Sequence, residues 1–183
     1  MRELALHLLD IAENSISAKA SNITIEVAEE VETDLLKLSV QDDGCGMDAE
    51  MAAAVVDPFV TSRTTRKVGL GIPLLKEAAE ACNGALQLES TPGKGTKIAV
   101  QFQHSHIDRM PLGDLTTTWM HLLVANPGVH WVFKYRFNKN EFIFDDEPVK
   151  KELEGVSLSE PSILNCLREM LQSGLEEASA NHA

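Results

Sequence analysis

The sequence has no long apolar run, few cysteines and no excess of positive charge, and each absence excludes a class of protein. No apolar run reaches the roughly 18 residues that a membrane-spanning helix requires. Aspartate and glutamate number 28 against 16 lysines and arginines, which gives a net charge of −12. Because so acidic a chain repels a phosphate backbone, the sequence predicts neither a membrane protein nor a nucleic-acid-binding protein.

The three cysteines, Cys45, Cys82 and Cys166, are odd in number and far apart, without the spacing of a zinc or redox motif. They are typical of unpaired thiols in a reducing compartment, so the sequence predicts a cytoplasmic protein. Apolar residues make up 44% and charged residues 24%, as in ordinary globular proteins. A length of 183 residues suits one domain, or one domain with an appendage.

Residues 3–19 predict an amphipathic helix, because apolar residues recur on one side at helical spacing. Asp10 and Asn14 are four residues apart and therefore neighbours on the polar side. An asparagine amide oxygen is a suitable ligand for Mg²⁺. A carboxylate one turn earlier can orient a water molecule or accept its proton. The same residues are also typical of the solvated side of a surface helix, and both interpretations remain open.

A glycine loop follows two runs of alternating apolar residues, 22–27 and 36–40, which predict an antiparallel pair of strands. The loop reads Asp42-Asp43-Gly44-Cys45-Gly46. Two glycines one residue apart let the backbone turn tightly and approach a ligand closely. Asp42, at the end of the second strand, can face the pocket that this turn creates. A short helix should follow, with Asp48 as its N-cap.

Residues 61–72 form a hydroxyl-rich, basic stretch that ends in glycines and leads into a predicted helix over 73–82. Glycines at the start of a helix offer unpaired backbone N–H groups and a positive dipole end, which suit phosphates. An ordinary loop with closely packed glycines is the alternative. The candidate phosphate-binding residues here are Thr61, Arg63, Lys67, Gly69, Leu70 and Gly71.

The last motif, Gly93-Lys94-Gly95-Thr96, lies between two further predicted strands. It can contact phosphate through backbone N–H groups and the Thr96 hydroxyl, or it is a hairpin with no further role. The helix before these strands should end at Asn83-Gly84, with Gly84 as its C-cap.

These four segments, in this order, resemble the GHKL superfamily, the Bergerat ATP-binding fold of gyrase, heat-shock chaperones, sensor histidine kinases and mismatch-repair ATPases. The resemblance covers residues 3–103. It implies an α/β (α+β two-layer) sandwich, in which helices lie on one face of a mixed or antiparallel sheet and a pocket lies between the layers. It also implies ATP and Mg²⁺ as ligands.

The resemblance assigns a role to each motif residue. Asp42 would accept the adenine amino group, which is a donor where guanine has an acceptor. Thr96 would flank the base or support Asp42. Asn14 would bind Mg²⁺, and Asp10 would activate water. Gly44 and Gly46 would let the backbone approach the base and sugar. Gly69 and Gly71 would cradle the phosphates.

One position departs from the family pattern, because hydrolytic branches carry glutamate where this chain has Asp10. Aspartate reaches about an ångström less far. Glu13 lies at the edge of the same side of the helix and is a second, weaker candidate for the base.

Residues 105–183 predict an α+β appendage to an ATP-binding domain at 1–104. Its expected elements are a helix over 114–125, a β-hairpin over 129–144 and a helix that begins at Pro161. This stretch holds most of the aromatic residues. They either pack against the first domain or form a surface for a protein partner or a homodimer.

Three functions remain open from the sequence. The first is an ATP·Mg-dependent switch with slow ATP hydrolysis. The second is a stand-alone protein kinase of the anti-sigma-factor or histidine-kinase type, and the third is a non-catalytic regulatory module that works by association.

Overall fold

The computed structural model describes residues 3–57 and 71–180. In the described part, the elements are α1 (Leu4–Ser17), β1 (Asn22–Glu30), β2 (Leu35–Asp42), α2 (Ala49–Val55), α3 (Gly71–Ala81), β3 (Ala85–Thr91), β4 (Gly95–Gln103), α4 (Leu115–Ala125), β5 (His130–Phe137), β6 (Asn140–Asp145), α5 (Asp146–Glu152) and α6 (Pro161–Ser179).

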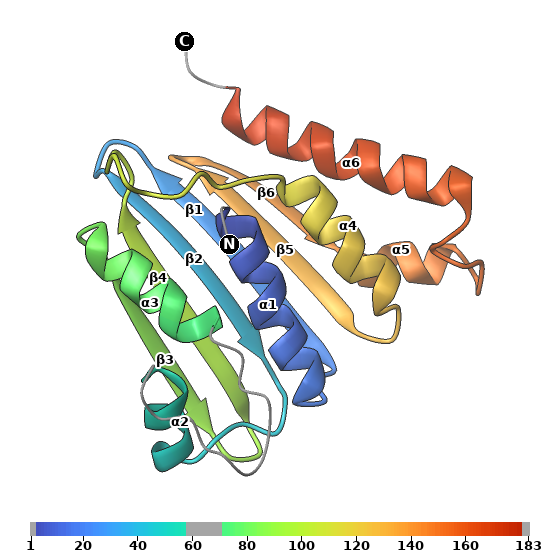
Figure 1. The fold of residues 1–183 in the computed structure, drawn as a ribbon. Helices are drawn as coiled ribbons and strands as arrows, with labels where there is room; N and C mark the ends of the chain where they lie inside the picture. Colours follow the sequence, from blue (N-terminus) through green and yellow to red (C-terminus); the bar gives the residue numbers. More distant parts are fainter. Residues whose placement is uncertain (1–2, 58–70, 181–183) are drawn as a thin grey trace.

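The strands form one sheet in the order β3-β4-β2-β1-β5-β6 (Figure 1). Strands β1 and β5 are parallel, and the other neighbouring pairs are antiparallel. Because side chains alternate between the faces of a strand, Ile23, Ile25 and Val27 all point to the buried face. The same alternation in β2 and β4 completes an apolar floor under the helices.

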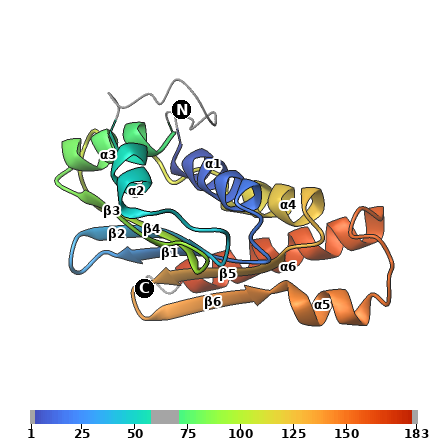
Figure 2. The ribbon, with the colours of Figure 1, turned by 90° about the horizontal axis from the view of Figure 1, so that it is seen from below.

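Helices α1 to α4 lie on the same side of the sheet, and α6 packs beside α4 and β6 (Figure 2). The opposite face of β3, β4, β2 and β1 carries no helix of the described residues. Helix α1 lies across the middle of the covered face, so its polar residues are brought to the end of the sheet where β2 finishes. The predicted α/β sandwich, with helices on one face of a mixed sheet, is confirmed.

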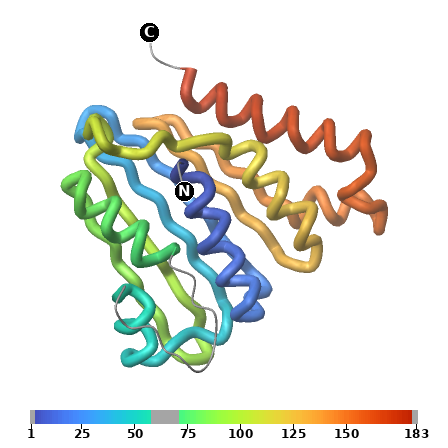
Figure 3. The backbone as a smooth tube through the Cα atoms, in the orientation of Figure 1, coloured from blue at the N-terminus to red at the C-terminus, as the bar shows by residue number. Residues whose placement is uncertain are grey.

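After β4 the chain crosses the end of the sheet to α4 and returns through β5 (Figure 3). Strand β5 pairs with β1 from Asn22↔His130 to Glu29↔Phe137. The stretch after residue 104 therefore continues the sheet of the stretch before it. The division into 1–104 and 105–183 stays a prediction, but the two stretches share one sheet and one apolar core.

Most aromatic residues of the second stretch are buried in that core, and Phe137 and Phe142 are partly buried against it. Trp119 of α4 stacks on Phe133 of β5, with ring centroids 4.8 Å apart and planes 4° apart. Trp131 and Phe144 stack on the same Phe133 ring at 5.8 and 6.0 Å. These four side chains are therefore packing residues and do not form an exposed partner surface.

One local expectation was wrong, and one helix was missed. Asn83, not Gly84, adopts the left-handed conformation after α3, with φ of +54°. Gly84 serves close packing, since a Cβ there would lie 1.8 Å from the carbonyl oxygen of Gln101. Helix α5 was not predicted at all.

Candidate functional site

A cavity of about 290 Å³ opens between α1 and the end of the sheet where β2 finishes. Motif residues from three segments line it: Asn14 of α1, Asp42 and Gly46 of the glycine loop, and Thr96 of β4. Its remaining wall is mostly apolar and includes Ile11, Met47, Met51, Val55, Ile72 and Ile98. A mostly apolar pocket with a few convergent polar groups is typical of a small-molecule site.

Asp42 is held against this cavity by three hydrogen bonds. The Ser15 hydroxyl donates to Oδ2 at 2.6 Å. The backbone N–H groups of Gly44 and Thr96 donate to Oδ1 at 2.9 and 3.2 Å. Thr96 is also the residue that pairs with Asp42 across β2 and β4. The carboxylate orientation is therefore fixed by the helix, the loop and the sheet together.

Asp43, next in the chain, has a different role. Its carboxylate accepts from the backbone N–H groups of Ser21 and Asn22 at 2.7 and 2.8 Å, and from the Asn22 side chain at 2.6 Å. Burial acts to raise the pKa of Asp43, but the hydrogen bonds from Asn22 and Ser21 outweigh it, so the pKa lies below its usual value. Asp43 fixes the loop to the start of β1 and does not line the cavity.

The glycine loop and the hairpin after β3 touch so closely that two positions require glycine. Gly46 has φ of +65°, and a Cβ there would lie 2.0 Å from the carbonyl oxygen of Thr91. Gly95 has φ of +105°, and a Cβ would lie 1.9 Å from the carbonyl oxygen of Asp42. Positive φ combined with such contacts excludes any side chain. The hairpin therefore supports the loop that carries Asp42.

Helix α1 brings its two candidate residues to different parts of the site. Asn14 is exposed and lines the cavity. Asp10, one turn earlier, is half-buried outside the cavity wall, with Oδ2 3.0 Å from the position of a Cβ on Gly71. Asp10 thus lies beside the start of α3. Glu13 is exposed and lines no part of the cavity.

Asn14 is an exposed residue that lines the cavity, and an amide oxygen can take a hard cation such as Mg²⁺; its role as a metal ligand stays a prediction. Gly71 is the first residue of α3. The other candidates from the same stretch fall outside the described residues: Thr61, Arg63, Lys67, Gly69 and Leu70.

Two serines were missed by the sequence reasoning. Ser15 falls on the apolar side of α1 by helical spacing and is buried there. Its hydroxyl has a partner, because it donates a hydrogen bond to Asp42. Ser90 faces Thr96 across β3 and β4, and a 2.8 Å hydrogen bond joins their hydroxyls. Ser90 also accepts from the backbone N–H of Met47 at 2.8 Å. A polar residue on an apolar face was the available signal for Ser15.

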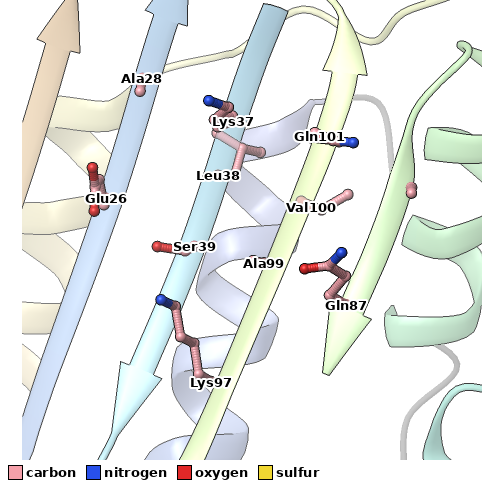
Figure 4. Close-up of a pocket in the computed structure, with 11 residues that line it drawn as sticks. Glu26, Ala28, Lys37, Leu38, Ser39, Gln87, Lys97, Ala99, Val100 and Gln101 are labelled. Atoms are coloured by element: carbon pink, nitrogen blue, oxygen red, sulfur yellow. The ribbon is translucent and has the colours of Figure 1, made fainter. Parts of the chain in front are cut away.

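A second hollow of about 290 Å³ lies on the helix-free face of the sheet (Figure 4). Its floor is made by small side chains such as Ala28 and Ala99, and Lys37, Lys97 and Gln87 stand around it. None of the motif residues or glycines that the structure describes lines it. Equal volume therefore does not decide between the two hollows, and their chemistry favours the first as the nucleotide site.

Comparison with known proteins agrees with this choice. Residues 2–106, more than half of the chain, match the family described as histidine kinase-, DNA gyrase B-, and HSP90-like ATPases. The chain belongs to this family. The predicted GHKL membership is confirmed, and the matched residues form a GHKL-type ATP-binding domain that includes all the described residues lining the cavity.

Similar curated proteins are much longer than this chain. The "Non-motile and phage-resistance protein" of Caulobacter vibrioides is 34% identical over 111 residues, which cover 56% of this chain and 13% of that protein. "Sensor protein kinase FleS" of Pseudomonas aeruginosa is 42% identical over 89 residues, which cover 49% and 22%. The part of the GHKL chain that matches thus covers less than a quarter of the length of either relative.

Solved structures share the fold at low sequence identity. The N-terminal domain of a DNA repair protein superposes with a TM-score of 0.54 at 16% identity, over 78% of this chain and 52% of that one. The Aquifex aeolicus MutL ATPase domain, solved with ADP, gives 0.50 at 16% identity, over 84% and 68%. These likenesses concern the fold alone.

No helix among the described residues has the length and apolar character to cross a membrane.

Proposed function

We propose that this GHKL protein binds ATP with Mg²⁺ in the cavity beside Asp42 and acts as an ATP-dependent switch that hydrolyses ATP slowly. The observation that carries the proposal is the fixed carboxylate of Asp42. An ionised carboxylate has about four lone-pair sites, and three are used by Ser15, Gly44 and Thr96. The remaining site can accept from the adenine amino group, while the apolar wall packs against the base.

The triphosphate would extend from the base along α1 toward the start of α3. Asn14 would hold Mg²⁺, whose chemistry is to neutralise phosphate charge. Asp10 lies beside Gly71, where the backbone N–H groups at the start of a helix favour phosphate. A carboxylate at that place can accept the proton of an attacking water, which is the support for slow hydrolysis.

The second candidate is a protein kinase, and the identity to a sensor protein kinase favours it. In that case a side chain of a protein partner would replace water as the acceptor of the γ-phosphoryl group. The same adenine and metal sites would serve both reactions. A switch also needs a protein partner or a second copy of the chain to act upon, and we propose this as part of the function.

Incubation with ATP labelled at the γ-phosphate separates these functions. Free labelled phosphate supports the ATPase, and label on a protein supports the kinase. A raised melting temperature without turnover supports a binding switch. Asp10→Asn should keep the ATP affinity and lose turnover. Failure of ATP·Mg to raise the melting temperature would refute the nucleotide site itself.

A further inference from the structure

His7 is a polar residue buried in the apolar part of α1 without a visible reason. Its side chain is 3% exposed, and its ring Nδ1 has no hydrogen-bond partner among the described residues. Buried polar atoms are nearly always paired, and an unpaired one costs about 1–3 kcal/mol. Leu4 and Leu8, its neighbours on the helix, are buried apolar residues. An apolar residue would therefore serve packing better than histidine does.

Asp10, three residues later, is a hydrogen-bond acceptor that has no donor among the described residues. Residues three apart on a helix share one side, and helical side chains lean toward the N-terminus. The Asp10 carboxylate therefore leans toward the turn that carries His7. In the described part of the chain, no residue donates a hydrogen bond to Asp10. A buried ring nitrogen and a half-buried carboxylate, one turn apart, thus both lack a partner.

The electrostatics of His7 agree with this pairing. Burial is the largest influence and lowers the pKa of His7, while the charge of Asp10 acts in the opposite direction. A histidine with a lowered pKa is neutral at pH 7 and carries one N–H donor and one acceptor nitrogen. A neutral imidazole can therefore donate to Asp10 without placing a cation near the triphosphate-bound Mg²⁺.

We propose that His7 is a positioning residue for Asp10. When nucleotide is bound, an imidazole N–H donates to the Asp10 carboxylate and holds it against the start of α3, facing the γ-phosphate. The inference rests on the proposed function, because only a reacting γ-phosphate gives the orientation of Asp10 a consequence. It adds a residue that acts through Asp10 and touches no ligand.

Two substitutions at position 7 separate positioning from packing. His7→Gln keeps an N–H donor at similar reach, whereas His7→Leu fills the space and cannot donate. We expect His7→Leu to lower kcat for phosphate release at least tenfold with the Kd for ATP·Mg unchanged within twofold. His7→Gln should stay within about threefold of the wild-type kcat. Equal kcat in the leucine and wild-type proteins, or equal losses in both variants, would overturn the proposal.

A measurement without turnover keeps the inference independent of hydrolysis and of the folding of the leucine variant. The ring ¹⁵N resonances of His7, assigned by their loss in His7→Gln, are recorded with and without Mg²⁺ and a non-hydrolysable ATP analogue. We expect them to move on binding in the wild type and to stay in place in Asp10→Ala, because alanine has no side-chain acceptor for the imidazole N–H. Movement in both proteins, or in neither, contradicts a hydrogen bond to Asp10.

The outcomes distinguish the two proposals. If the wild type binds the analogue but releases no phosphate from ATP, hydrolysis is wrong and the ring resonances still decide the role of His7. If the wild type binds no nucleotide, both proposals fall together. If phosphate is released normally while the resonances do not respond, the function stands and the positioning role of His7 is refuted.

Discussion

Replacing Asp42 by asparagine tests adenine recognition without disturbing the fold. The amide oxygen can take the place of Oδ1 and still accept from the N–H groups of Gly44 and Thr96. The amide NH₂ then lies beside the Ser15 hydroxyl, which can accept from it and donate to the carbonyl oxygen of Ile11, 3.3 Å away. Every internal hydrogen bond therefore has a replacement, and the loss falls on the ligand.

The size of that loss follows from the charge of the acceptor. Hydrogen bonds to charged groups contribute about 1.5–3 kcal/mol, and each 1.4 kcal/mol is about tenfold in affinity. The Asp42→Asn variant should therefore bind ATP about 10- to 150-fold more weakly. At an ATP concentration about 100 times the wild-type Kd, ligand stabilises the wild type by about 2.7 kcal/mol, and a 30-fold weaker variant by about 0.9 kcal/mol.

Calorimetric titration with ATP·Mg, together with melting curves, measures both quantities. Asp43→Asn is the matched control, because it makes the same chemical change one residue along, where the side chain fixes the loop and does not line the cavity. It should lower the melting temperature slightly and leave the affinity within a fewfold of the wild type. The reasoning is refuted if Asp42→Asn binds ATP as tightly as the wild type.

Three further predictions concern the loop support, the shared sheet and the buried histidine. Gly95→Ala should destabilise the fold and weaken ATP binding, because its Cβ would meet the backbone oxygen of Asp42 at 1.9 Å. The control is Gly93→Ala, whose Cβ would lie in open space at φ of +74°; it should lower the free energy of unfolding by only about 1–2 kcal/mol and leave ATP binding unchanged. Urea unfolding measures the stability and titration with ATP measures the affinity. A fragment of residues 1–104 leaves β1 as an open edge and should aggregate or stay unfolded in gel filtration and circular dichroism, so a sharply melting monomer would contradict this. Burial lowers the folded-state pKa of His7 below its ordinary 6.5, so the unfolded chain binds more protons near pH 6, and the free energy of unfolding falls as the pH drops from 7 to 5. His7→Leu should reduce this dependence of the unfolding free energy on pH. An unchanged dependence would contradict the lowered pKa of His7.

Alternating apolar residues predicted most strands and their buried faces, because a half-buried strand has a period of two. The same pattern could not predict which strands are parallel. Strand β5 pairs with β1 across a separation of about a hundred residues, and nothing local in 130–137 indicates that partner. The sequence therefore predicted an appendage after residue 104, whereas the strands of that stretch extend the central sheet.

Helix α5 was missed because its stability comes from charge pairs and a cap, without an apolar period. The Asp145 side chain accepts from the N–H of Glu147 at 2.9 Å. Asp146 is buried and forms a 2.6 Å ion pair with Lys150, one turn on. Pro148 lies in the first turn, where its missing N–H is not needed. These features are local in the sequence, but Asp146 also accepts from the N–H of Trp131 in β5 at 3.0 Å, and only the folded chain brings that partner close.

The site was predicted in part. The structure places Asn14, Asp42, Gly46 and Thr96 around one cavity, and their roles toward ATP stay predictions. Each of these residues follows from a local pattern of glycines, a strand end or a helix face. Ser15 does not, because its partner Asp42 comes from another segment, and only the folded chain brings the hydroxyl within 2.6 Å of the carboxylate.

The helix that carries Asp10 and Asn14 is tied at its N-terminal end to a distant part of the chain. The first N–H groups of an α-helix have no partner within the helix. In α1 two of them, on Leu4 and Ala5, donate to the carbonyl oxygens of Pro111 and Leu112 at 3.0 and 2.8 Å. The segment between β4 and α4 thus caps the helix of Asp10 and Asn14. A nucleotide that shifts the start of α1 must therefore carry this segment with it or break both hydrogen bonds. Helix α1 also packs directly on α4, whose Trp119 is stacked on Phe133 of β5, so α1 joins the cavity to the stretch after residue 104.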